Sequence, residues 1–187
     1  MTTIAIIGAG PAGLIAADFV VIPLSPDLFS LQGLRNLGPT FRDWRKGWAD
    51  RVERKPSMPV EIPGGKMQPL GYIVQQHGVR LDRPVKAYDK WIKRIPSEYR
   101  SHVLDQDKPT TASVLDDPHS LALLKHYRSL MPMAQEARKP MFHLKPADGA
   151  IGSHYQSAKD AFDDFEKLAR QIEKQAKLRI DMADWRQ

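Results

Sequence analysis

The residues DFVVIPLSPDLFSLQGLRNLGP, positions 18–39, join a continuous apolar run to a helical pattern. The apolar run is Phe19–Leu24, and the turn Ser25-Pro26-Asp27 follows it directly. Beyond this turn, which resembles a helix cap with proline at the first helical position, one helical face carries Leu31, Leu34 and Leu37. A fully apolar strand that leads directly into a helix is typical of a buried parallel sheet. The stretch therefore predicts an α/β fold with helices flanking a parallel sheet.

Length and composition predict one domain spanning residues 1–187, which is long enough for a hydrophobic core. Hydrophobic residues make up 42% of the chain and charged residues 27%, as in ordinary globular proteins. No apolar run approaches the ~18 residues of a membrane span, and MTTIAIIGAG lacks the basic start of a secretory signal. The absence of cysteine excludes disulfides and thiolate zinc sites. We therefore expect a cytoplasmic protein that does not enter a membrane.

Residues 1–13 form a divergent glycine-rich start with the pattern Gly8-x-Gly10-x-x-Gly13 behind a short apolar strand. Such a pattern is typical of a dinucleotide-binding turn, in which a helix N-terminus receives a pyrophosphate. A crossover to the next parallel strand needs about a dozen residues or more, but only residues 14–18 separate Gly13 from Phe19. We therefore expect no stoichiometric FAD. An FAD- or NAD-binding oxidoreductase fragment remains the alternative function.

The rest of the chain alternates between predicted strands and helices, which is typical of parallel α/β sheets. Strands are expected at 4–7 and 69–76, on either side of Phe19–Leu24, and a short last strand at 140–144. Helices are expected at 83–104, with a break or kink at Pro96, and at 120–139, with a kink near Pro132. An amphipathic helix at 151–176 should cover the sheet. Gly38-Pro39 should end or kink the first helix. Residues 55–66 should form a loop, and residues 105–118 an exposed linker within the domain.

Two short strings carry a family resemblance: the strand end Val21-Ile22-Pro23-Leu24 and the helix start Ser30-Leu31-Gln32-Gly33-Leu34. They resemble the ParA/Soj group of partition ATPases, the deviant-Walker branch of the P-loop NTPases. The resemblance extends over roughly residues 14–177 and includes HYRSLMPMAQEARKPMF at 126–142. It implies a truncated, Rossmann-like three-layer P-loop NTPase domain. It also implies a role in chromosome or plasmid partitioning, with ATP-dependent dimerisation and non-specific DNA binding.

The phosphate-binding part of that family's site is missing from this sequence. There is no G-x-x-x-x-G-K-[ST] motif, and the Walker B aspartate of the family aligns with Gly8. The family uses ATP and Mg²⁺, but we expect this chain alone to hydrolyse no ATP and to hold no cofactor, metal or catalytic residue. The resemblance implies that part of a base pocket survives. The candidate nucleotide-binding residues are Gly8, Gly10, Gly13, Gln75, Pro146, Ala147 and Asp148.

A net charge of +6 and a pI near 9.5 permit an acidic partner. The basic residues concentrate on the polar faces of two predicted helices. If these faces lie side by side, they form one positive patch for weak, sequence-independent DNA binding. The patch would contain Arg42, Arg45, Lys46, Arg51, Arg54, Lys86, Lys90, Lys93 and Arg94. The alternative for these basic residues is an ordinary solvated surface. For the protein as a whole, the alternatives are contact with a partner protein or a homodimer, and a catalytically dead scaffold that only pairs with other chains.

Overall fold

The computed structural model describes residues 4–6, 17–54, 64–77, 79–80, 83–84, 90–106 and 112–178. Within them, one four-stranded sheet has the order β1-β2-β3-β6 and contains β1 (Ile4–Ile6), β2 (Phe19–Leu24), β3 (Gln68–His77) and β6 (Ser120–Lys125). Every neighbouring pair in this sheet is parallel. The predicted α/β class is therefore confirmed, as is the position of Phe19–Leu24 between two parallel neighbours.

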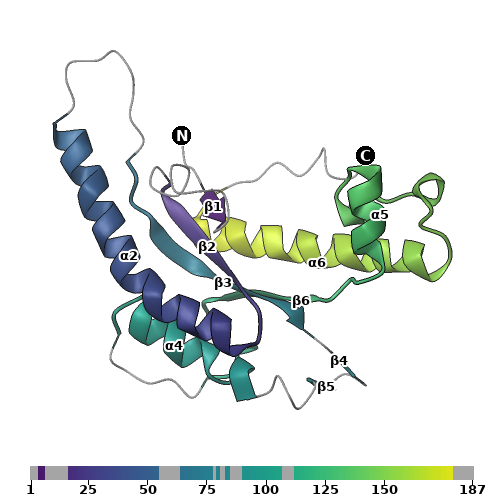
Figure 1. Ribbon diagram of the computed structural model, residues 1–187, viewed down its shortest axis with the longest axis horizontal. Coiled ribbons are helices and arrows are strands. Elements are labelled where there is room, and N and C mark those ends of the chain that lie inside the picture. Colours follow the sequence, from purple (N-terminus) through teal and green to yellow (C-terminus); the bar gives the residue numbers. More distant parts are fainter. Residues whose placement is uncertain are drawn as a thin grey trace.

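Helices cover both faces of the sheet (Figure 1). On one face lie α2 (Leu28–Glu53) and α4 (Ile95–His102), and on the other lies α6 (Ser153–Ala176). Side chains of β2 alternate between the two faces because successive residues of a strand point in opposite directions. Val20, Ile22 and Leu24 belong to the core under α2 and α4, whereas Val21 belongs to the core under α6. The helix predicted at 151–176 is thus confirmed as a layer over the sheet.

A third, smaller core lies at the first half of α6, beside the sheet (Figure 1). It joins α6 to α5 (Leu130–Ala137) and to the single 3-10 turn η1 (Met141–His143), and a second such turn, η2 (Pro146–Asp148), follows η1 in the chain. Its buried members are Leu130, Leu144, Ala150, Ala158 and Ala161. A separate two-stranded antiparallel sheet pairs β4 (Val79–Arg80) with β5 (Arg83–Pro84).

The long helix α2 begins at Asp27, whose carboxylate accepts a 2.7 Å hydrogen bond from the Ser30 amide. Asp27 is therefore the N-cap, and Pro26 precedes the helix instead of occupying its first position. The helix continues through Gly38 and Pro39, so of the two expected effects, an end or a kink, the end does not occur. An interior proline costs about 3 kcal/mol. Burial of Leu31, Leu34 and Phe41 on the sheet contributes about 4–9 kcal/mol, which offsets that cost.

Three predicted elements differ from the structure. Of the helix expected at 83–104, residues 83–84 form β5, residues 90–92 are helical, and α4 begins only after a turn at 93–94. Pro96 lies in the first turn of α4, where the missing amide needs no partner. The helix expected at 120–139 is wrong at its start, because Ser120–Lys125 is β6 and only Leu130–Ala137 is helical. Its Leu-Ala-Leu-Leu run favours a helix, but pairing with β3 overrides that propensity. The strand expected at 140–144 is the 3-10 turn η1.

The linker expected at 105–118 is not exposed throughout. Val114 is 2% exposed and Asp117 is 3% exposed, so both belong to the interior. The predicted loop 55–66 lies outside the described residues apart from 64–66. Among the helices that the structure describes, none is both long and apolar enough to cross a membrane.

Candidate functional site

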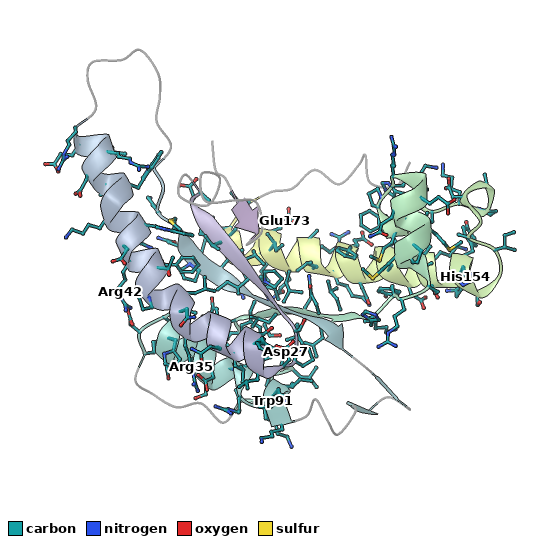
Figure 2. All side chains as sticks on the ribbon, in the orientation of Figure 1. Asp27, Arg35, Arg42, Trp91, His154 and Glu173 are labelled. Carbon is teal, nitrogen blue, oxygen red and sulfur yellow. The ribbon has the colours of Figure 1, made fainter. Side chains whose placement is uncertain are left out.

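A pocket of about 840 Å³ lies between the segment 139–145 and the first half of α6. The α6 side of this η1–α6 pocket extends over residues 155–166, about three helical turns. In Figure 2, His154 marks the end of α6 at which the pocket begins. The lining residues are Lys139, Phe142, His143, Leu144, Lys145, Tyr155, Gln156, Ala158, Lys159, Phe162, Asp163 and Glu166.

The apolar part of the pocket is built around the Phe142 ring. Its centroid lies 6.3 Å from that of Phe162 and 5.1 Å from that of Phe165, both on α6. The His143 ring meets it edge-on at 4.9 Å. These separations are those of favourable tilted and edge-to-face aromatic pairs. The η1 turn therefore places a fixed aromatic surface against α6.

Lysine side chains stand at the rim of the pocket. The Lys139 ammonium donates to both carboxylate oxygens of Asp148, at 2.7 and 2.9 Å. This bond, followed by one from the Lys145 amide, holds the pKa of Asp148 below its usual range. The Lys159 Nζ lies 4.6 Å from the centroid of the Tyr155 ring. Within the described part of the chain, Lys145 and Lys159 make no ion pair, so both cations are available to an anion.

The lining also contains two carboxylates, both further along α6 than Lys159. Asp163 is exposed, and Glu166 forms a 2.9 Å ion pair with Arg170 one turn along α6. Nearby, the Tyr127 hydroxyl donates a 2.7 Å hydrogen bond to Asp164, which ties the end of β6 to α6. Burial, followed by this hydrogen bond, raises the pKa of Tyr127. The lining of the pocket thus combines aromatic rings, lysines and carboxylates.

The predicted nucleotide-binding residues are not gathered in this pocket. Gln75 is exposed near the end of β3 and does not line it. Pro146, Ala147 and Asp148 form η2 beside the pocket, and Asp148 is bonded to two of its lining residues, the Lys139 ammonium and the Lys145 amide. Gly8, Gly10 and Gly13 lie outside the described residues.

The two basic helical segments do not form one patch. Arg35 of α2 pairs with Glu98 of α4, Gly38 packs against the carbonyl of His102, and Arg42 pairs with Asp105. In these three contacts the residue numbers on the α2 side and on the α4 side increase together, so the two helices run side by side in the same direction. The segment 90–94 therefore lies beside the first half of α2, whereas 46–54 is at its far end (Figure 1). The condition for a continuous positive patch is not met.

Several predicted DNA-binding residues already have partners. Arg42 pairs with Asp105 at 2.6 Å, and Arg94 pairs with Glu98 at 2.9 Å. The half-buried Arg45 donates a 2.6 Å hydrogen bond to the Met67 carbonyl, and burial lowers its pKa. Lys90 lies 5.1 Å from the centroid of Trp91, Lys93 is exposed, and Lys86 is outside the described residues. Exposed cations without an ion pair among the described residues remain at Lys46, Arg51 and Arg54.

A second polar cluster surrounds Asp117, which sequence reasoning placed in an exposed linker. Its fully buried carboxylate accepts hydrogen bonds from the Tyr72 hydroxyl at 2.8 Å and from Arg100 at 2.8 Å. The His119 amide donates a third bond at 3.1 Å. The Tyr99 ring contacts the rings of Tyr72 and His119, with centroids 5.1 and 5.4 Å apart. No local pattern distinguishes Asp117 from the acid beside it, because its partners come from distant segments.

The pKa shifts of the tyrosines and the histidine in this cluster all favour the neutral forms of these side chains. Burial, followed by the hydrogen bond to Asp117, raises the pKa of Tyr72, and burial also raises the pKa of Tyr99. Burial lowers the pKa of His119. The charges of the cluster are therefore those of Asp117 and Arg100, which neutralise each other at the junction of β3, α4 and β6. Among the described residues there is no group of three or more His, Asp or Glu that could hold a metal ion.

The described fold is a three-layer α/β domain with a parallel sheet. In comparisons with known proteins, no family model, no curated protein and no solved structure matches this chain.

Proposed function

We propose that this chain is a ParA-like partitioning protein that binds DNA or a partner protein and does not hydrolyse ATP by itself. The observation that carries the proposal is the geometry of the stretch with the family resemblance. Val21 to Leu24 lie in an inner strand of a parallel sheet, and Asp27 caps the helix that follows at once. The resemblance implies this strand–turn–helix arrangement.

The lack of hydrolysis follows from the sequence. Phosphoryl transfer in P-loop enzymes depends on loop amides, a lysine and a magnesium-bound hydroxyl that hold the phosphates. This chain has no G-x-x-x-x-G-K-[ST] motif, and Gly8 takes the place of the Walker B acid. Base contacts from Gln75 or the η2 turn would leave the triphosphate and its metal unheld. The protein then acts through what it binds.

For DNA, the supporting feature is the far half of α2, which extends past α4 (Figure 1). Lys46, Arg51 and Arg54 are exposed there, without an ion pair in the described structure. Asp50 and Glu53 lie between them and Asp43 precedes them, so the local excess of positive charge is small. We therefore expect weak binding that is lost as the salt concentration rises, because contacts between these cations and the DNA phosphates release condensed counterions.

The experiment is fluorescence anisotropy of a labelled duplex at low and rising salt. The triple variant Lys46→Glu, Arg51→Glu and Arg54→Glu should lose binding. A matched control reverses the same number of exposed charges elsewhere, at Arg128, Lys167 and Lys174. Arg45 is left unchanged because its guanidinium supports the chain at Met67. An equal loss of DNA binding in both variants would show that binding depends only on the net charge of the protein. No binding at low salt would leave a partner protein as the proposed target.

The alternative function, a flavin- or nicotinamide-binding oxidoreductase fragment, is favoured by one observation. The strand β1 (Ile4–Ile6), which precedes the glycine pattern, pairs in parallel with β2. Dinucleotide-binding folds begin with such a strand. A flavin absorbance band of about one chromophore per chain after purification would support this function and contradict the partitioning proposal.

A further inference from the structure

We propose that the η1–α6 pocket binds a small ligand in which a planar aromatic ring carries a single anionic group, a carboxylate or a phosphate. The proposal rests on the pocket alone and is independent of DNA binding. Three properties point to this class of ligand: an aromatic surface, two lysines without an ion pair among the described residues, and carboxylates further along α6 than Lys159.

The ring of the ligand is matched by the apolar side of the pocket. Phe142 and Phe162 provide aromatic surface, and Tyr155, which is 38% exposed, forms part of the wall near the rim. Aromatic side chains favour offset or edge-to-face contact with another ring. The volume of about 840 Å³ lies within the range of pockets for small organic ligands.

The anionic group is matched by Lys145 and Lys159. Lys159 is held near the rim by its contact with Tyr155, and Lys145 immediately precedes η2. Lys139 adds little attraction because Asp148 already neutralises it at 2.7 Å. The charge available to a ligand is therefore that of two lysines.

Asp163 sets the limit on ligand charge. It lies one helical turn beyond Lys159 on α6 and would repel a second anionic group placed beside it, whereas Glu166 is already paired with Arg170. A single anion beside a ring avoids this repulsion, whereas a long polyanion such as a triphosphate meets it. The pocket thus selects for one anionic group near the rim.

The first test measures binding of 1-naphthyl phosphate and 1-naphthoate by calorimetry. We expect a dissociation constant of about millimolar or tighter for at least one of them, as fits a ligand of this size. Neutral 1-naphthol and inorganic phosphate should each bind about tenfold more weakly, because 1-naphthol lacks the anionic group and inorganic phosphate lacks the aromatic ring. AMP and ATP are measured in the same way. Binding of AMP would show that a nucleotide can supply both the aromatic ring and the single anionic group. Tighter binding of ATP than of every ligand with one anionic group would overturn the proposed limit on ligand charge.

The second test assigns the site. The double variant Lys145→Gln and Lys159→Gln should weaken binding of the naphthyl anion by about tenfold or more. The double variant Lys167→Gln and Lys174→Gln removes the same charge from exposed positions of α6 outside the pocket and should bind normally. Amide chemical shifts on titration should change at residues 155–166, which locates the ligand even if a variant folds poorly. Absence of binding, equal weakening in both variants, or shifts confined to other residues would each overturn the proposal.

Discussion

The hydroxyl of Tyr72 on β3 donates a 2.8 Å hydrogen bond to the buried carboxylate of Asp117, in the turn before β6. Arg100 of α4 reaches the same carboxylate at 2.8 Å, with 13% of its side chain exposed. One carboxylate thus connects two strands and a helix that lie far apart in the sequence. This connection lies where β3 meets the start of β6, beside the close approach of Gly71 to the His119 carbonyl.

Asp117→Asn should destabilise the protein by about 3–5 kcal/mol, because it leaves the charge of Arg100 largely buried and without its counterion. The measurement is urea denaturation followed by circular dichroism. Asp116→Asn is the matched control, because Asp116 is exposed and bonded only locally to Ser113 in the described structure. It should change the free energy of unfolding by less than about 0.5 kcal/mol. A loss of similar size in both variants would contradict the role assigned to the buried pair.

Gly38→Ala should destabilise the protein, because a Cβ at this position of α2 would collide with the backbone carbonyl of His102. Gly33 and Gly47 lie on the same helix with open space around them. Gly33→Ala and Gly47→Ala should therefore stabilise the protein by about 0.5–1 kcal/mol each, the usual gain for alanine within a helix. Thermal unfolding of the three variants tests this difference in sign. Stabilisation by Gly38→Ala would mean that α2 and α4 are not in close contact.

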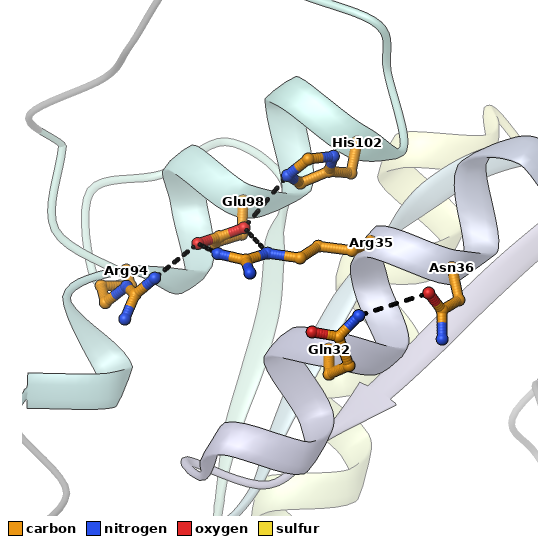
Figure 3. Close-up of polar contacts among 6 residues, drawn as sticks. All are labelled: Gln32, Arg35, Asn36, Arg94, Glu98 and His102. Atoms are coloured by element: carbon orange, nitrogen blue, oxygen red, sulfur yellow. Dashed lines mark hydrogen bonds and ion pairs between the residues drawn. The ribbon is translucent and has the colours of Figure 1, made fainter.

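Stability should depend on Glu98 between pH ~4.3 and about 2 (Figure 3). Hydrogen bonds from Arg35 at 2.9 and 2.8 Å, opposed by burial and joined by Arg94, hold the pKa of Glu98 down to about 2. Since this folded-state pKa is below the unfolded value, the ion pairs stabilise the protein above pH ~4.3. The contribution is lost as the pH falls to about 2. His102 also faces this carboxylate at 3.2 Å and adds positive charge when protonated.

The check compares the free energy of unfolding of Glu98→Gln with that of the unchanged protein across this pH range. We expect a difference of about 1–2 kcal/mol at neutral pH, because solvent screens the partly exposed Arg35 and Arg94. The difference should decrease as the pH falls. Glu136→Gln, at an exposed position of α5, is the control and should show no such trend. A difference that is constant with pH would show that Glu98 acts only through packing.

The chain should show no magnesium-dependent ATPase activity and should bind ATP no tighter than about millimolar. The reason is the absence of a G-x-x-x-x-G-K-[ST] lysine and of an acid at Gly8. Calorimetry with ATP and Mg²⁺, combined with a phosphate-release assay, measures both quantities. Micromolar affinity or steady turnover would instead make Gly8 to Gly13 a phosphate-binding loop.

Much of the sheet could be predicted because its signals are local. Buried strands are predicted by the apolar runs at Phe19–Leu24 and 69–76, and the structure pairs these two strands in parallel. The apolar stripe at 151–176 likewise predicted α6 over the sheet. The candidate site could not be read in this way. The pocket arises where Phe142 and Lys145 meet Tyr155 and Lys159, and no periodicity in either segment indicates the other.

The sequence by itself determined the α/β class, the inner strand β2, the amphipathic helices α2 and α6 and the lack of a P-loop motif, because these depend on neighbouring residues and on residue types. Only the tertiary structure decided that Ser120–Lys125 is a strand, that Pro39 lies inside a helix and that Asp117 is buried. The tertiary structure also places the basic residues 46–54, at the far end of α2, away from the basic segment 90–94 that precedes α4. In each of these cases, contacts between distant segments outweigh the local preference, since burial and strand pairing contribute more free energy than propensity.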